Sequence, residues 1–293
     1  MTLSQPPGSA PASDTRASNL TLRVASAAVL APITLAITYL GGSPFYVLCA
    51  IAAAGILWEW VSLASHRADA RVLTPGWLGI LGALVLIALR LPEGSWVAVA
   101  AAALAAGFAV AAFPRLADDR FAPLWAAGGV IYAGALLIAP ALLRGDPQWG
   151  LTAIFFLLAN VWATDIVAFF CGRAVGGPLL WPRVSPKKTW SGAIGGLVGG
   201  IAVSVAVAYA SGIGKLGIVG VMACVLSVLA QAGDLLESSV KRHFGAKDAS
   251  RLIPGHGGLM DRLDGFLVAA LAAVLIGIIH DGVAAPARGL LVW

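Results

Sequence analysis

Nine apolar stretches, each close to the length needed to cross a lipid bilayer, dominate this chain of 293 residues. They lie at about 24–42, 45–64, 76–90, 96–113, 124–142, 150–172, 189–211, 216–237 and 259–280. A helical crossing needs roughly 20 apolar residues. The composition agrees, because 59% of the residues are hydrophobic and only 11% are charged, unlike the usual soluble domain. We therefore expect an all-α, polytopic integral membrane protein with about nine transmembrane helices.

The distribution of polar residues divides the chain into three parts. Residues 1–22 are rich in Ser, Pro and Ala, lack the features of a signal peptide, and are predicted to be a disordered cytosolic tail. Residues 23–148 contain only Glu59 as an acid within an apolar stretch, and we expect them to form a transmembrane scaffold. Residues 149–293 contain the other acids of the helices, so this C-terminal half is predicted to be the catalytic region.

Lys and Arg residues are distributed unevenly between the two sides of the membrane. If nine crossings alternate from a cytoplasmic N-terminus, fifteen of the 19 Lys and Arg residues lie on the cytoplasmic side. The positive-inside rule then places the N-terminus and the two most basic segments, 173–188 and 238–262, in the cytoplasm. This bias and an anion-binding site together account for the net charge of +5, so we expect no nucleic acid partner.

Small residues line one face of the seventh apolar stretch. Gly192, Gly196 and Gly200 follow one another at intervals of four, and Gly195 and Gly199 lie beside them. Such a face allows neighbouring helices to approach closely, and close packing is the interpretation that we favour.

Acidic residues gather at the end of the eighth apolar stretch. Asp234, Glu237 and Lys241 are spaced so that they share one face of a helix. Glu237 has two explanations, a salt bridge to Lys241 or a role in function. Asp234 lies one turn deeper in the membrane, where a carboxylate usually faces a polar cavity, pairs with a partner or binds a cation.

Asp261 and Asp264 are also three residues apart, at the start of the ninth apolar stretch. Carboxylate oxygens are the ligands that Mg²⁺ prefers, and Mg²⁺ typically takes one or two of them together with substrate phosphates and water. Two cations that bridge nucleotide phosphates would also suit these groups. The alternative is that both aspartates only stabilise the N-terminus of a helix.

A basic loop precedes these aspartates. It contains Lys241, Arg242, Lys247 and Arg251 and ends in the glycine-rich segment 254–258. Glycines allow close backbone approach to a ligand, and the free N–H groups of a following helix favour anions, so the loop is predicted to bind phosphate. His256, taken alone, is more often structural than catalytic.

A second basic segment follows the sixth apolar stretch, about two turns after Asp165. Ser185, Lys187 and Lys188 precede the start of the seventh helix. Lysine is a common partner of phosphate, so a role in substrate binding is one interpretation. The other is that the two lysines only set the topology and contact anionic lipid.

Together, these residues resemble the signature of the phosphatidate cytidylyltransferases, also called CDP-diacylglycerol synthases. The residues that match the signature are Ser238, Val240, Lys241, Arg242, Lys247, Asp248, Ser250, Ile253, Pro254, His256, Gly257, Gly258, Leu259, Asp261, Arg262, Leu263 and Asp264. The segments 233–238 and 185–192 also resemble family patterns, although many relatives have Glu where this chain has Ser191. The resemblance covers residues 160–270 well, and the N-terminal half only as a generic membrane scaffold.

The resemblance implies a reaction and assigns roles to residues. Family members convert CTP and phosphatidic acid to CDP-diacylglycerol and pyrophosphate, and they require Mg²⁺. By resemblance, Asp234, Asp261 and Asp264 are metal ligands and catalytic residues, together with Lys241 and Lys247. The substrate-binding residues would be Ser185, Lys187, Lys188, Arg242, Asp248, His256, Gly257, Gly258 and Arg262.

The same resemblance predicts the partners and the location of the chain. CTP and phosphatidic acid would be substrates, membrane lipid would surround the protein, and two copies would form a homodimer. The expected location is a bacterial inner membrane, with the N-terminus and the active site facing the cytoplasm, where CTP is available.

Two other functions remain as alternatives. A cation- or proton-coupled transporter could use Asp165, Asp234 and Asp261 as relay carboxylates, but such acids should span the bilayer. A CDP-alcohol phosphotransferase also uses carboxylate pairs on membrane helices. However, its Asp-Gly-x-x-Ala-Arg pattern is absent from this sequence.

Overall fold

The computed structural model describes residues 12–65, 69–113, 120–253 and 257–293, and it is mainly helical. The elements are α1 (Ala12–Leu40), α2 (Gly42–Ser65), α3 (Ala70–Ala88), α4 (Pro92–Ala112), α5 (Ala122–Arg144), α6 (Gly150–Val175), β1 (Leu179–Trp181), β2 (Ser185–Thr189), α7 (Trp190–Ala210), α8 (Leu216–His243), α9 (Met260–Asp281) and α10 (Pro286–Leu291).

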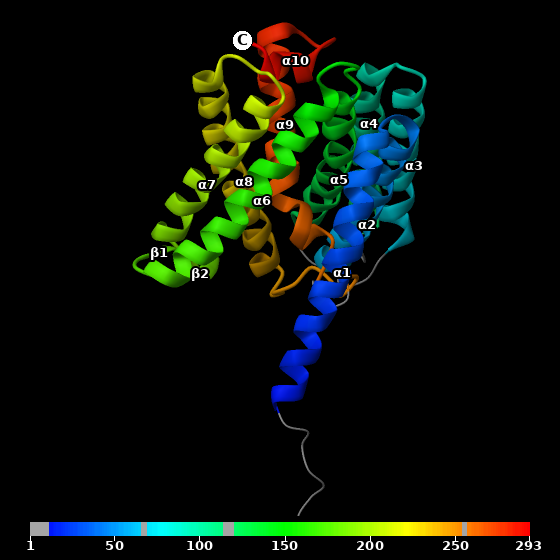
Figure 1. Cartoon of the computed structure of the whole chain (residues 1–293). Coiled ribbons are helices and arrows are strands. Elements are labelled where there is room, and N and C mark those ends of the chain that lie inside the picture. The colour runs from blue at the N-terminus through cyan, green and yellow to red at the C-terminus, as the bar shows by residue number, and fades with distance from the viewer. Residues whose placement is uncertain (1–11, 66–68, 114–119, 254–256) are drawn as a thin grey trace, which may run out of the picture.

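The predicted membrane architecture is confirmed. Within the described residues, eight helices, α2 to α9, are long and apolar enough to cross a bilayer, and the apolar part of α1, Ala28–Leu40, is shorter. About nine membrane helices therefore fit the structure. Helix α1 begins at Ala12, inside the segment expected to be a tail, and its first turns extend beyond the other helices (Figure 1).

The helices pack in two groups with α9 between them (Figure 1). Helices α2 to α5 pack against one another on one side, and α6, α7 and α8 pack together on the other. Helix α9 contacts α8 and α6 in one group and α5 and α2 in the other. The predicted scaffold and the predicted catalytic half therefore share an interface along α9.

The small residues of α7 pack directly against α6. A side chain added at Gly196 would come within 2.7 Å of the Thr164 carbonyl oxygen, and one at Gly192 within 2.9 Å of the Ala168 carbonyl oxygen. In the same core, Thr164 and Ser227 of α8 share a hydrogen bond of 2.8 Å. The prediction that this glycine face serves close helix packing is confirmed.

One local element differs from the all-α expectation. The second basic segment is not an irregular loop, because β1 and β2 pair antiparallel as a short hairpin between α6 and α7. Helix α6 ends where Gly176 and Gly177 adopt positive φ angles of 64° and 100°, which glycine tolerates best. At the other end of the hairpin, the Thr189 hydroxyl accepts a hydrogen bond of 3.1 Å from the Gly192 N–H and caps α7.

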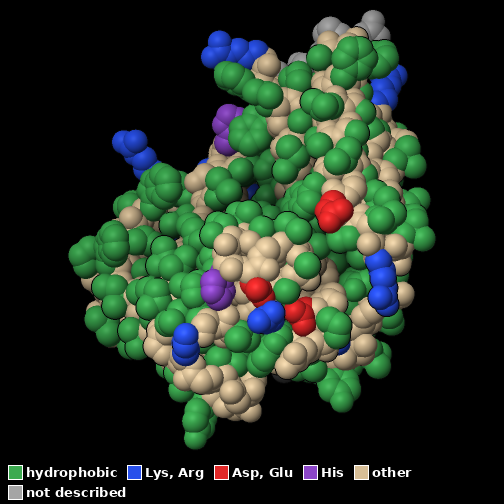
Figure 2. Space-filling view, turned by 90° about the horizontal axis from the view of Figure 1, so that it is seen from above, with side chains coloured by type: hydrophobic (Ala, Val, Ile, Leu, Met, Phe, Trp, Pro, Cys, Tyr) green, Lys and Arg blue, Asp and Glu red, His purple; other side chains and the backbone are tan. Residues whose placement is uncertain are grey.

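Helix α8 is longer than its apolar stretch, since it continues to His243 and includes Lys241 and Arg242. These two residues therefore lie on a helix instead of in the basic loop. The hairpin, the end of α8 and the start of α9 lie at one end of the molecule, and α10 lies at the other (Figure 1). Viewed from the α10 end, the surface is largely apolar with scattered charged side chains (Figure 2).

Candidate active site

A lysine between two carboxylates joins the end of α8 to the start of α9. Lys241 Nζ lies 2.6 Å from Glu237 Oε2 and 2.5 Å from Asp261 Oδ1. Glu237 and Lys241 are buried and Asp261 is nearly so; the side chain of Glu237 is 1% exposed and the other two are 10% exposed. The predicted pair of Glu237 and Lys241 is confirmed, and Asp261 extends it to a second helix.

The second oxygen of Asp261 binds the backbone of the loop that precedes α9. Asp261 Oδ2 accepts hydrogen bonds from the N–H groups of Gly258, at 2.8 Å, and Ala249, at 3.1 Å. A side chain at Gly257, whose φ is 87°, would come within 3.0 Å of that same oxygen. The glycines therefore allow the loop to close tightly around the Asp261 carboxylate.

Glu59 is an important residue of this region that the sequence analysis assigned only to the scaffold. It lies on α2, is fully buried, and reaches the same loop from the N-terminal half. Its Oε1 accepts hydrogen bonds from the Leu259 N–H at 2.8 Å and the Ser250 hydroxyl at 2.5 Å, and its Oε2 accepts one from the Met260 N–H at 2.6 Å. The one available signal in the sequence was a single acid within an apolar stretch.

A second group of charges lies beside the first. Lys188 of β2 forms an ion pair with Asp234 of α8, and each side chain is about one-third exposed, at 30% and 33%. Asp264 of α9 is buried, and it lies near enough to Asp234 and to Asp165 of α6 for the like charges of these carboxylates to repel one another. Asp165 in turn interacts with Lys188 and Arg262. Three helices and the hairpin thus bring carboxylates and cations to one place.

The remaining predicted residues lie nearer the surface. Ser185 is half-buried, and Lys187, Lys247 and Asp248 are exposed. The sequence prediction for His256 falls outside the described residues.

Arg242 is exposed as well, and its Nη1 donates a hydrogen bond of 2.7 Å to the Ala246 carbonyl oxygen. Arg262, also exposed, interacts electrostatically with Asp165, as described above. Among the predicted substrate-binding residues that the structure describes, Lys188 contacts Asp234 and Gly258 contacts Asp261.

The carboxylates suit Mg²⁺ to different degrees. Among the described residues, no three His, Cys, Asp or Glu side chains are arranged to hold a metal ion by themselves. Asp234 and Asp264 nevertheless supply two hard oxygen donors, and one or two protein carboxylates are typical for Mg²⁺ that also binds substrate phosphates. Asp261 differs in the kind of partners that it has. Its oxygens bind the buried Lys241 and two backbone N–H groups, whereas those of Asp234 bind the partly exposed Lys188 and, at 3.4 Å, the Ser238 hydroxyl.

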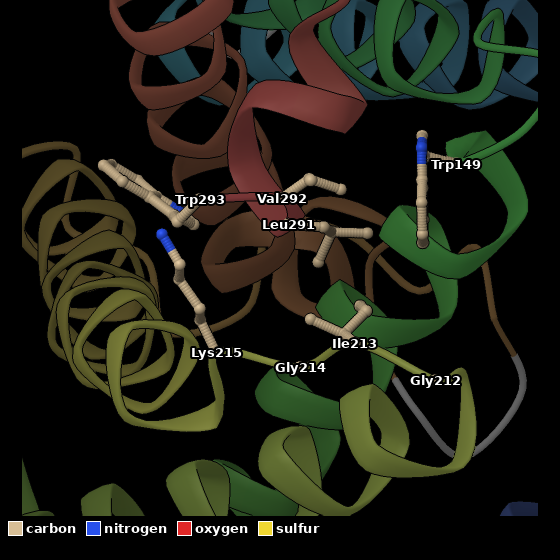
Figure 3. Close-up of a pocket in the computed structure, with 8 residues that line it drawn as sticks. All are labelled: Trp149, Gly212, Ile213, Gly214, Lys215, Leu291, Val292 and Trp293. Carbon is tan, nitrogen blue, oxygen red and sulfur yellow. The ribbon is translucent and has the colours of Figure 1, made fainter.

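A cavity of about 220 Å³ lies far from these charges, near α10. Figure 3 shows its lining residues, which are Trp149, Gly212, Ile213, Gly214, Lys215, Leu291, Val292 and Trp293. Its lining has one charged side chain, Lys215, and no carboxylate side chain. The candidate active site is therefore the charged region at the opposite end.

Known proteins that resemble this chain agree with the chemistry of that region. The family model described as "Cytidylyltransferase family" matches residues 21–279. A protein of Brucella abortus biovar 1 (strain 9-941), named phosphatidate cytidylyltransferase, is 44% identical over 265 residues, which cover 89% of this chain and 94% of the relative. A protein of the same name from Staphylococcus haemolyticus (strain JCSC1435) is 36% identical over 197 residues, covering 64% of this chain and 75% of the relative. The chain therefore belongs to the cytidylyltransferase family.

Proposed function

We propose that this integral membrane protein is a phosphatidate cytidylyltransferase that converts CTP and phosphatidic acid to CDP-diacylglycerol and pyrophosphate. The observation that carries this proposal is the meeting of carboxylates and lysines at one end of α6, α8 and α9. Such a site can bind two phosphorylated substrates at the level of the lipid headgroups. The names of the two relatives give the same reaction.

The reaction needs positioning and charge neutralisation more than proton transfer. An oxygen of the lipid phosphate attacks the α-phosphorus of CTP, a new P–O bond forms, and the bond to the β-phosphate breaks to release pyrophosphate. The attacking oxygen is already anionic at neutral pH, so no general base is required. Lys188 and Lys241 would hold phosphate groups close together and offset their mutual repulsion.

We assign Mg²⁺ to Asp234 and Asp264. Bound there, the ion would neutralise charge on the triphosphate. Asp261 would instead keep Lys241 in place, since its oxygens already bind Lys241 and two backbone N–H groups. Residues Gly257 and Gly258 would give the loop the close turn that this arrangement needs.

The proposal also includes an orientation and an assembly state. The end that carries the hairpin and the start of α9 would face the cytoplasm, which supplies CTP, and α10 would face the other side. The protein would act in a bacterial inner membrane, since both relatives are bacterial. It would act there as a homodimer.

The test is the release of pyrophosphate and the formation of CDP-diacylglycerol by purified protein in detergent. Both products should appear in equal amounts with CTP, phosphatidic acid and Mg²⁺, and neither should appear when any one component is omitted. Excess EDTA should stop the reaction, and added Mg²⁺ should restore it. Consumption of CDP-diacylglycerol with an added alcohol would instead indicate a phosphotransferase. Ion flux in vesicles without any nucleotide chemistry would indicate a transporter.

A further inference from the structure

Glu59 connects the N-terminal half of the chain to the active-site loop. Its carboxylate accepts three hydrogen bonds, all from residues that follow it by about two hundred positions. We propose that Glu59 is a positioning residue, which holds the loop and the start of α9 so that Asp261 keeps Lys241 in the active site. This inference rests on the proposed function.

The start of α9 needs an acceptor from elsewhere in the molecule. The first N–H groups of a helix have no partner within the helix, and a polar residue at the cap usually supplies one. Here the cap position is Leu259, whose side chain has no oxygen. Glu59 therefore provides the cap from α2, and its negative charge also suits the positive end of the helix.

Glu59 and Asp261 act on neighbouring backbone groups. Asp261 binds the N–H of Gly258, and Glu59 binds the next two N–H groups, those of Leu259 and Met260. The two carboxylates thus share three consecutive donors. A shift of the loop away from Glu59 would also move Asp261, and with it the Lys241 ammonium group 2.5 Å away.

The end of α8, which carries Lys241, is also held by the N-terminal half of the chain. Trp60, next to Glu59, donates a hydrogen bond of 2.9 Å to the Trp125 carbonyl oxygen. The Trp125 ring lies 5.0 Å from the ring of His243 and 5.1 Å from that of Phe244, at the end of α8. Residues 59 and 60 thus help to fix both helix ends between which Lys241 and Asp261 meet.

The first experiment compares Glu59→Gln with wild type and with Glu93→Gln. Glutamine keeps the size of the side chain but loses the charge and one acceptor, so the N–H of Leu259 or Met260 loses its partner. We expect kcat for CDP-diacylglycerol formation to fall about tenfold or more, with KM for phosphatidic acid changed less than about twofold. Glu93 is exposed in the first turn of α4, and the same change there should leave kcat unaltered.

Two further measurements separate positioning from loss of folded protein. Rates are normalised to the monodisperse, folded fraction of each variant. Glu59→Asp, which keeps the negative charge, should retain more activity than Glu59→Gln. Hydrogen exchange followed by mass spectrometry should show faster exchange in residues 249–253 and 257–261 of Glu59→Gln, and no change in the hairpin at 179–189. Ser250→Ala removes one of the three donors and should lower kcat severalfold, which keeps the test available if Glu59→Gln does not fold.

The outcomes are distinct. A folded Glu59→Gln variant with the kcat and the exchange pattern of wild type would overturn the positioning role. If Glu59→Gln cannot be obtained, a folded Ser250→Ala variant with wild-type kcat would overturn it instead. Absence of CDP-diacylglycerol formation by wild type would instead refute the proposed function. In that case the exchange experiment still decides whether Glu59 holds the loop.

Discussion

Replacement of Lys241 by methionine should strongly destabilise the protein, because it leaves two buried carboxylates without their shared cation. Lys241 Nζ lies 2.6 Å from Glu237 and 2.5 Å from Asp261, and all three side chains are at most 10% exposed. Breaking a buried ion pair by removal of one partner costs about 3–5 kcal/mol. At about 2–4 °C per kcal/mol, we expect the unfolding temperature to fall by roughly 10 °C.

The assay is thermal unfolding of the purified protein in detergent, with Arg242→Met as the matched control. Arg242 is the next residue, carries the same charge and is exposed, with a hydrogen bond to the Ala246 carbonyl oxygen. Its replacement should change the unfolding temperature by no more than about 2–3 °C, because exposed polar contacts contribute little. Adding Glu237→Gln to Lys241→Met should recover part of the loss, since it removes one unpaired charge. Equal unfolding temperatures for Lys241→Met and Arg242→Met would refute this reasoning.

Three other outcomes follow from the structure. Lys188→Gln should reduce CDP-diacylglycerol formation about 100-fold. The unfolding temperature should stay nearly unchanged, because the ion pair of Lys188 with Asp234 is partly exposed and worth about 0–1 kcal/mol. A large loss of stability in this variant would contradict the prediction. Gly196→Ala should lower the unfolding temperature, since the added carbon would come within 2.7 Å of the Thr164 carbonyl oxygen, whereas Gly217→Ala, which meets no atom within 4 Å, should not. Removal of Mg²⁺ with EDTA should abolish activity without lowering the unfolding temperature by more than a few degrees, and activity that persists in EDTA would contradict the metal proposal.

Much of the architecture could be predicted because its determinants are local. Apolar stretches of spanning length identify membrane helices regardless of how those helices pack. Residues three or four apart share a helix face, so the pair of Glu237 and Lys241 could be read directly from the spacing. The glycine face of α7 was also visible in the sequence, although its partner, α6, was not.

The contacts that could not be predicted join residues far apart in the chain. Lys188 and Asp234 are 46 positions apart, and spacing alone gives no reason to pair them. Glu59 contacts residues up to 201 positions away, and the sequence offered only its charge in an apolar environment as a signal. The hairpin was also missed, because its strands have three and five residues and follow a proline- and glycine-rich segment without clear alternation.

The central claim is that the carboxylates and lysines at this end of α6, α8 and α9 carry out cytidylyl transfer. The most direct test is formation of CDP-diacylglycerol from CTP and phosphatidic acid by wild type and by Asp234→Asn, a substitution at a side chain that is 33% exposed. We expect wild type to release one pyrophosphate per CDP-diacylglycerol formed. The rate of Asp234→Asn should be lower by a factor of about 100 or more, at an unchanged unfolding temperature. No product from folded wild type, or equal rates for both proteins, would contradict the account.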